Sequence, residues 1–241
     1  NNKAVEVERP NESDFSSISI IPLRNKGKKE DDFYAYSLSL DIFSKISSTS
    51  NIITSSMEDV EALMPSYKSK EISKKLQTRY CLSGSLWKKD NFFNLSLELF
   101  DHNNKKIIWA DSWLEDWNNL PNIESTISGN LIKILDSSSS SSDSSYSNIT
   151  DSEAYRIYLK AKYIYYNRQS NKDTLKSERL FNESITIDKT LIQPRMLLGE
   201  IIYKKGDYNQ ALKIFKDNLK MSLDTNDLKN ISSSLSSLGA I

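Results

Sequence analysis

The sequence predicts two parts, a mixed α/β domain followed by an all-α array of helical hairpins. Strand-length apolar runs alternate with helix-spaced segments early in the chain, strict apolar/polar alternation follows, and only helical spacing remains from Asp151 onward. A run of serines separates the two parts. We therefore expect a disordered lead-in at 1–16, an α/β domain at 17–136, a serine-rich linker at 137–150 and helical repeats at 151–241.

The first domain begins with strands and helices in alternation. Residues 17–23 form an apolar run that includes Pro22, which predicts a buried strand. Helical spacing follows at 31–47, then a short strand at 51–54 and two short helices at 57–64 and 69–77. This order predicts a βαβα unit.

In the middle of the chain, apolar and polar residues alternate with a period of two. The strand segments are 79–87, 92–101 and 106–113, and apolar residues alternate with polar ones along the second. The segments between them have the length and composition of hairpin turns. We therefore expect an antiparallel meander, followed by a helix at 122–135.

The remainder is helical throughout. The expected helices span about 152–169, 172–187, 191–205 and 208–222, and a fifth begins near Asp227. Gly206 and Asp207 mark a tight break between the third and fourth helices.

The third and fourth helices carry a spaced pattern that resembles the tetratricopeptide (TPR) repeat. It consists of Leu198-Gly199, Ile202, Gly206-Asp207-Tyr208, Ala211-Leu212 and Phe215. We expect Gly199 and Ala211, twelve positions apart, to face each other where the two helices are closest.

A second Leu-Gly pair supports the repeat, because Leu238-Gly239 follows Leu198-Gly199 at a distance of forty residues. Since one repeat cannot bury its own apolar face, further repeats are expected beyond Ile241. The alternative is a helical hairpin of another type with a small-residue contact.

The first domain resembles the TolB-like domain family in three segments. Residues 19–23 resemble its opening strand, residues 80–86 its Tyr-aliphatic-Leu-x-Gly-Ser-aliphatic segment, and residues 99–101 with 108–111 its strand, turn and Leu-Trp-Ala-Glu ending. The chain departs from the family at Leu23, where phenylalanine is usual, and at Tyr36-Ser37, where Asp-Gly is usual. The resemblance implies a mixed α/β fold and supplies no catalytic residues. With TPR repeats after it, such a domain resembles the regulatory regions of bacterial cyclase-like and kinase-like signalling proteins.

Composition and motifs exclude several classes of function. Lys plus Arg equals Asp plus Glu at 32 each, which gives no electrostatic reason to expect nucleic acid. No apolar run is long enough to insert into a membrane. Cys81 and His102 are the only residues of their types, so no thiolate cage or histidine metal site is expected. We expect no catalytic residue, no cofactor and no metal in this stretch, and therefore no enzyme.

Two further clusters have both a structural and a functional interpretation. The first is an acidic group, Asp111, Glu115 and Asp116. Its simpler interpretation is a set of solvated carboxylates, and the functional one is an acid/base pair. The second is a tryptophan group, Trp109, Trp113 and Trp117. Its simpler interpretation is packing in the core, and the functional one is a platform for a ligand.

The candidate binding site is the face made by the first helix of each hairpin. This face lines the concave side of repeat arrays, and tyrosine offers a large contact area with a polar tip. We predict that it binds a peptide or protein through Tyr155, Tyr158, Lys162, Tyr165, Tyr166, Gln193, Met196, Glu200, Tyr203 and Lys204. The alternative is that several of these tyrosines pack against the next helix or against the α/β domain.

The function expected from the sequence is a non-catalytic interaction and regulatory module of a bacterial signalling protein in the cytoplasm. One alternative is a regulatory fragment of a longer nucleotide cyclase or protein kinase. A second is an envelope-associated scaffold, which would be periplasmic if a signal precedes the chain.

Overall fold

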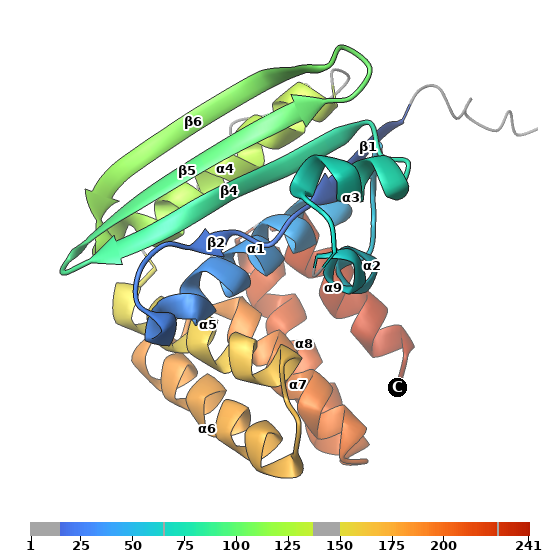
Figure 1. Cartoon of the computed structure of the whole chain (residues 1–241). Coiled ribbons are helices and arrows are strands. Elements are labelled where there is room, and N and C mark those ends of the chain that lie inside the picture. The colour runs from blue at the N-terminus through green and yellow to red at the C-terminus, as the bar shows by residue number, and fades with distance from the viewer. Residues whose placement is uncertain (1–14, 65, 137–149, 226) are drawn as a thin grey trace, which may run out of the picture.

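The structure, a computed structural model, describes residues 15–64, 66–136, 150–225 and 227–241 (Figure 1). The predicted lead-in and serine linker lie outside the described residues, except for Phe15, Ser16 and Thr150. Within the described ranges, a mixed sheet with its helices is followed by an array of helices, which confirms the predicted fold class at this level.

Among the described residues, six strands form the sheet: β1 (Ser16–Ile20), β2 (Arg24–Asn25), β3 (Ile52–Thr54), β4 (Tyr80–Lys89), β5 (Phe92–Asp101) and β6 (Lys106–Asp116). The order is β3-β1-β4-β5-β6, and β2 pairs with β4 beside this path. β1 runs parallel to β3 and β4, whereas β4, β5 and β6 are antiparallel, as the period-two segment predicts.

Three details of the strands differ from the prediction. β1 ends at Ile20 rather than at Leu23, because Pro22 has no N–H for the ladder and the Leu23 N–H instead donates to Ser39 Oγ at 2.8 Å. The pairing of β2 with β4 was not predicted, since two residues carry no readable period. β6 continues to Asp116 instead of ending at residue 113.

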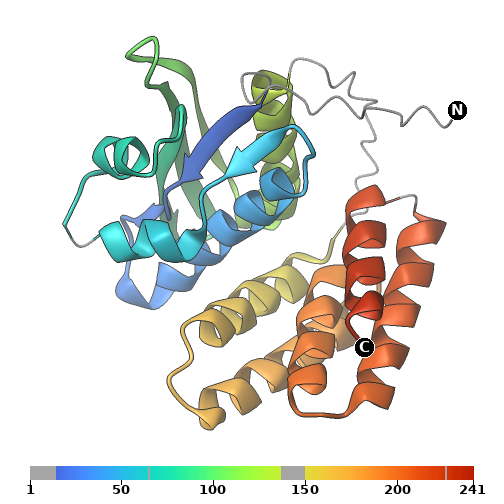
Figure 2. The ribbon, with the colours of Figure 1, turned by 90° about the vertical axis from the view of Figure 1, so that its right-hand side faces the viewer.

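The helices of the first domain are α1 (Asp32–Ser47), α2 (Met57–Leu63), α3 (Ser69–Lys75) and α4 (Leu120–Leu135), with short 3-10 turns η2 (Lys29–Asp31) and η3 (Trp117–Asn119). α1 and α4 share one core with the apolar side of β5, whose Phe93, Leu95 and Leu99 are fully buried. α2 and α3 cover part of the other side, where Val60 and Ile72 pack with Cys81. Figure 2 shows α3 and α4 on opposite faces of the sheet.

The second part consists of α5 (Ser152–Tyr166), α6 (Asn171–Ile187), α7 (Ile192–Lys204), α8 (Tyr208–Asp224) and α9 (Leu228–Gly239). Side chains at the N-caps accept backbone hydrogen bonds and so fix the helix starts, as at Asp151 and Ser170. Gly206 has a φ of +86°, the left-handed conformation that the turn between α7 and α8 requires.

The small-residue contact between α7 and α8 differs from the prediction. A Cβ on Gly199 would lie 2.5 Å from Cε1 of Phe215, and the three nearest atoms all belong to that ring. Ala211 is buried, but it is the aromatic ring of Phe215, and not Ala211, that fills the space over Gly199. Gly199 therefore faces a larger residue than the predicted alanine. The physical reason for a glycine is as predicted, since its lack of a side chain lets the two helices approach closely.

The two parts pack directly on each other through α1 and α5. Ser37 Oγ donates to the Leu159 carbonyl at 2.7 Å, and the rings of Tyr36 and Tyr163 meet edge to face at 5.5 Å. One hydrophobic cluster includes residues of both, such as Leu38 and Leu159. The helical array is thus held against the α/β domain by a continuous core.

Candidate functional site

A buried polar cluster joins α1 to α5. Lys162 Nζ donates to Asp41 Oδ1 at 2.6 Å, Tyr158 Oη donates to the same oxygen at 2.7 Å, and Tyr155 Oη donates to Oδ2 at 3.0 Å. The side chains of Asp41 and Lys162 are 12% and 5% exposed. Both carboxylate oxygens of Asp41 are therefore satisfied by groups that come from the helical array.

The burial of this cluster determines its protonation. Removal from water, and then the charge of Asp41, raise the pKa of Tyr155 and of Tyr158 well above the ordinary value. Both phenols stay neutral donors across the physiological range. Asp41 is thus a junction between two parts of the chain that are 114 to 121 residues apart in sequence.

A cleft of roughly 610 Å³ opens beside this cluster, between the α/β domain and the array. One wall comes from α1 and α2, with Tyr36, Ser44, Glu58 and Glu61. The opposite wall comes from α5, α7 and α9, and its members include Tyr158, Lys162, Tyr166, Gln193, Met196 and Ser233. The cleft has the size of an ordinary ligand site, and neither part of the chain forms it alone.

The wall from α1 and α2 carries the polar chemistry. Burial, then a hydrogen bond to Glu61 and the charge of that carboxylate, raise the pKa of Tyr36 above its usual range. Within the described part of the chain, Glu61 Oε1 is buried and has no hydrogen-bond partner. Such an atom is uncommon in folded proteins, where nearly every buried polar atom has a protein or water partner.

Half of the residues predicted from the sequence come together in this cleft. They are Tyr158, Lys162, Tyr166, Gln193 and Met196, which lie on the first helices of the two hairpins. The cleft therefore contains part of the predicted face, and α1 and α2 of the first domain cover it.

The structure places the other predicted residues elsewhere. Tyr155 is buried against Asp41, and Tyr165 is buried next to Phe181, with ring centroids 6.4 Å apart. The Lys204 ammonium donates to Glu200 and to the Tyr165 hydroxyl at 3.1 Å. Tyr203 Oη donates to the Ala240 carbonyl at 2.9 Å, next to the end of α9.

The predicted open tyrosine face needs correction at its first helix. Tyr155, Tyr158, Lys162 and Tyr165 are at most 6% exposed, because α1 and neighbouring helices of the array cover them. Among these tyrosines only Tyr166, at 47%, is widely exposed. The alternative that several tyrosines pack against the α/β domain is the one the structure shows.

Sequence reasoning missed the whole wall from α1 and α2, including Tyr36, Asp41 and Glu61. Asp41 carried a weak signal, since it is a single charge within the apolar run Leu38-Ser39-Leu40-Asp41-Ile42 of α1. Its pairing with Tyr155, Tyr158 and Lys162 of α5 had no local signal, although those three residues were predicted as binding residues. Glu61 follows the acidic first turn of α2, which carries Glu58 and Asp59, and a solvated role is the ordinary expectation there.

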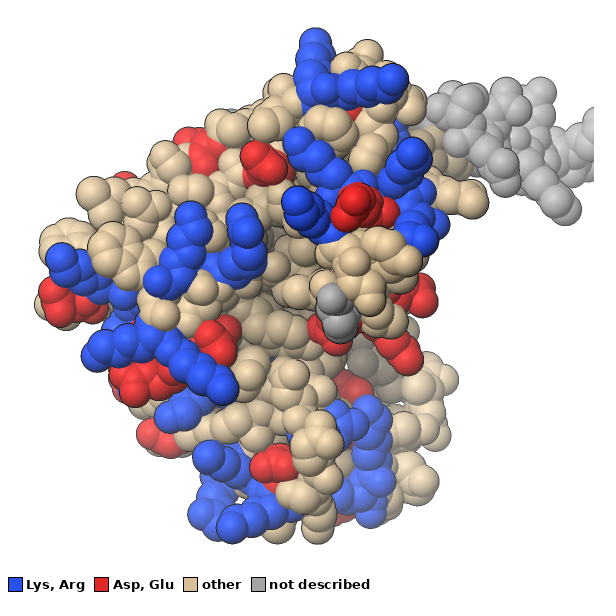
Figure 3. Space-filling view, in the orientation of Figure 1, with Lys and Arg blue, Asp and Glu red and all other residues tan. Residues whose placement is uncertain are grey.

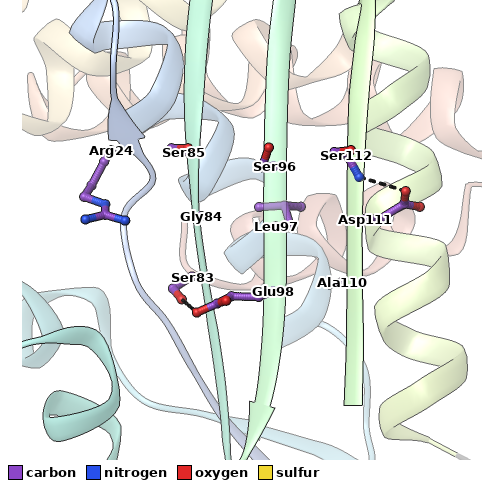
Figure 4. A pocket seen from close by; sticks show the side chains of 10 residues that line it. All are labelled: Arg24, Ser83, Gly84, Ser85, Ser96, Leu97, Glu98, Ala110, Asp111 and Ser112. Atoms are coloured by element: carbon purple, nitrogen blue, oxygen red, sulfur yellow. Dashed lines mark hydrogen bonds between the residues drawn. The ribbon is translucent and has the colours of Figure 1, made fainter. Parts of the chain in front are cut away.

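A second hollow, of roughly 490 Å³, lies on the sheet (Figure 4). Hydroxyls of Ser85, Ser96 and Ser112 occupy directly paired positions on β4, β5 and β6. Ser83 Oγ donates to Glu98 Oε1 at 3.3 Å, and Arg24 stands at the edge beside β4. This hollow is open to solvent, and Leu97 and Ala110 line it together with the polar groups.

Basic side chains gather over α3 on one face of the molecule (Figure 3). Two of them stack on aromatic rings, Lys70 on Phe100 at 4.0 Å and Lys75 on Tyr67 at 4.3 Å. Acidic residues are interspersed among them, and Glu71 of α3 accepts the Lys68 N–H. The patch is mixed in sign, as the balanced composition leads one to expect.

The lone histidine and the tryptophans have structural partners. His102 Nε2 lies 2.7 Å from Ser73 Oγ, and its ring meets Phe100 edge to face. Trp109 and Trp113 are adjacent at 6.3 Å and half-buried on the core, and Trp117 packs against Tyr34. Among the residues with described positions, no group of three or more His, Cys, Asp or Glu is arranged to hold a metal ion. The helices in the same ranges include none long and apolar enough to cross a bilayer.

Comparison with known proteins finds only remote likenesses. No family model and no curated protein matches the sequence. Similar solved structures include TolB from Acinetobacter baumannii, at 11% identity and a TM-score of 0.38, covering 50% of this chain and 28% of that one. PelC from Paraburkholderia phytofirmans has 12% identity and a TM-score of 0.35, with 51% and 88% covered. Lipoprotein GNA1162 from Neisseria meningitidis has 16% identity and a TM-score of 0.35, with 52% and 99% covered.

These likenesses concern about half of the chain, and the chain spans little more than a quarter of the length of TolB. At such identities and TM-scores they carry no conclusion about function. The class of protein is therefore defined by its own features: an α/β domain and a helical array that enclose a cleft between them.

Proposed function

We propose that this chain is a non-catalytic binding module, in which the cleft between the α/β domain and the helical array receives a peptide segment of a partner protein. The observation that carries the proposal is the cleft itself: five residues predicted from the concave face of the array line it together with α1 and α2. A groove formed by the first helices of stacked hairpins is a surface that suits an extended or helical peptide.

The helical hairpins are proposed to be of the TPR type, and the first domain of the TolB-like type. Support comes from the Gly199–Phe215 contact, the Gly206 turn and the Leu-Gly spacing of forty residues. The signalling context, the cytoplasmic location and the absence of catalysis in this chain remain parts of the proposal.

The Asp41 cluster supports binding at the cleft, because it fixes the two walls relative to each other. A preformed site loses less conformational entropy on binding than one that must be assembled. The buried ion pair and the two phenol hydrogen bonds hold α5 on α1 directly beside the cavity.

The test is selection of peptides from a random displayed library, followed by binding measurements with a variant whose cleft is filled. Ser44 is exposed and lines the cleft, so Ser44→Trp occupies its mouth. Ser232→Trp, on the exposed side of α9, is the matched control. Selected peptides are expected to bind the wild type and the control and to lose at least about tenfold in affinity for Ser44→Trp, which corresponds to ~1.4 kcal/mol. Equal binding to all three proteins would refute the proposal.

A further inference from the structure

The charge of the cleft is not balanced within its own walls. Asp41 is neutralised by Lys162, which is the one basic residue among the described residues that line the cavity. Glu58 and Glu61, both from α2, line the same cavity. The lining therefore has two carboxylates for which it supplies no cation.

Glu61 has the stronger requirement for a partner. The Tyr36 hydroxyl is a neighbouring hydrogen-bond donor to this carboxylate, but the Glu61 Oε1 is shielded from solvent and has no hydrogen-bond partner within the described residues. A buried carboxylate oxygen without a donor is costly, and native proteins rarely leave one in that state. A bound group that donates hydrogen bonds would remove this cost.

The remaining walls suit a cation on an aliphatic stem. Tyr36, Phe43 and Tyr166 provide aromatic rings, whose faces attract cations. Met57 and Met196 provide flexible apolar contacts for methylene groups. Lysine and arginine combine these two features, a charged head and an apolar stem.

We propose that the cleft binds the basic side chain, lysine or arginine, of the partner peptide, and that Glu61 accepts hydrogen bonds from its ammonium or guanidinium group. This inference rests on the proposed function and adds the chemistry of the ligand to it. Charge complementarity favours such a segment over an acidic one, because an acidic side chain would meet Glu58 and Glu61.

The test uses small probes, so that weak binding is measurable by NMR titration of the full chain. The probes are Nα-acetyl-lysine methylamide, which keeps its side-chain ammonium, its uncharged analogue Nα-acetyl-norleucine methylamide, and spermidine as a free polyamine. Glu61→Gln keeps the shape of the side chain and removes its charge. Glu183→Gln, at an exposed position of α6, makes the same change of net charge away from the cleft.

The lysine probe is expected to shift the amides of α1, α2 and α5 and to bind about tenfold more weakly to Glu61→Gln, with Glu183→Gln unchanged. Binding of the norleucine probe as tight as that of the lysine probe would overturn the inference, as would an unchanged affinity in Glu61→Gln. If spermidine binds, and binds more weakly to Glu61→Gln, while the lysine probe does not bind, the ligand is a free polyamine and the peptide assignment is wrong.

The two proposals fail separately. Library peptides that require an open cleft but contain no excess of lysine or arginine would leave the binding function intact and overturn the ligand chemistry. Peptides that ignore the Ser44→Trp substitution would refute the binding function whatever their charge.

Discussion

Lys162 of α5 and Asp41 of α1 form an ion pair at 2.6 Å that links the helical array to the α/β domain. Both side chains are largely removed from water, and Tyr158 donates to the same carboxylate oxygen. Without Asp41, the Lys162 ammonium would remain buried and uncompensated. The pair thus makes the relative position of the two parts specific.

Asp41→Ala is expected to destabilise the protein by about 3–5 kcal/mol, since removal of one partner leaves a buried charge. The measurement is urea unfolding followed by circular dichroism. Glu30→Ala is the control, because Lys28 and Glu30 lie 3.7 Å apart with side chains 80% and 74% exposed. Its effect should stay within about 1 kcal/mol, the usual range of surface pairs.

The double variant Asp41→Leu/Lys162→Met separates charge from packing. Apolar residues of similar size often replace a buried pair at little cost. The double variant should therefore be more stable than Asp41→Ala. If it is equally unstable, loss of packing or of the Tyr155 and Tyr158 hydrogen bonds, rather than loss of the ion pair, explains the effect.

Gly199→Ala is expected to destabilise the α7–α8 hairpin by about 1–3 kcal/mol, because the new methyl group would lie 2.5 Å from the Phe215 ring. Gly129→Ala in α4 is the matched control, since a Cβ there has no neighbour within 4 Å. Alanine is the better helix former, so this control should gain up to about 1 kcal/mol. The measurement is thermal unfolding of both variants. A loss of stability in both would contradict the explanation that contact with Phe215 causes the effect.

The elements were largely predictable because their periods are strong. Each helix from α1 to α9 and each strand except β2 lies within a few residues of its predicted position, since burial on one face imposes a period that the sequence must display. β2 has two residues and its pairing depends on β4, so no local pattern encodes it.

Of the cleft, only residues on the wall from the helical array were predicted from the sequence. The first helices of the hairpins display their face in the sequence, which identified Tyr158 and Met196. That α1 covers this face depends on contacts between residues more than a hundred positions apart, such as Asp41 with Lys162. Helical periodicity does not encode such contacts, and so an open groove was expected where a roofed cleft exists.

The stability of the β5–β6 hairpin should depend on pH through Asp101. Burial opposes ionisation of this carboxyl, but hydrogen bonds from Arg79 and from the N–H groups of Asn103 and Asn104 outweigh it and lower its pKa below the usual value. A carboxyl with a lowered folded-state pKa stabilises the fold above its ordinary pKa, near 4, and loses that contribution as the pH falls through the folded value.

Asp101→Asn should therefore differ from the wild type most at pH 5 and above, and the difference should shrink toward pH 2. Urea midpoints of both proteins across this range test it. Other carboxyls titrate equally in the two proteins and cancel in the comparison. A constant difference at every pH would show that Asp101 acts by its shape and not by its charge.

Cys81 should be unreactive until α3 moves away from the sheet. The thiol is fully buried with Ile72 of α3, and burial raises its pKa to about 11. At pH 8 the folded chain should react with Ellman's reagent at least about a hundredfold more slowly than the unfolded chain, because little thiolate is present and access is blocked. Ser232→Cys in a Cys81→Ala background, an exposed thiol on α9, should react at once. Fast reaction of native Cys81 would instead mean that α3 opens readily while the fold persists.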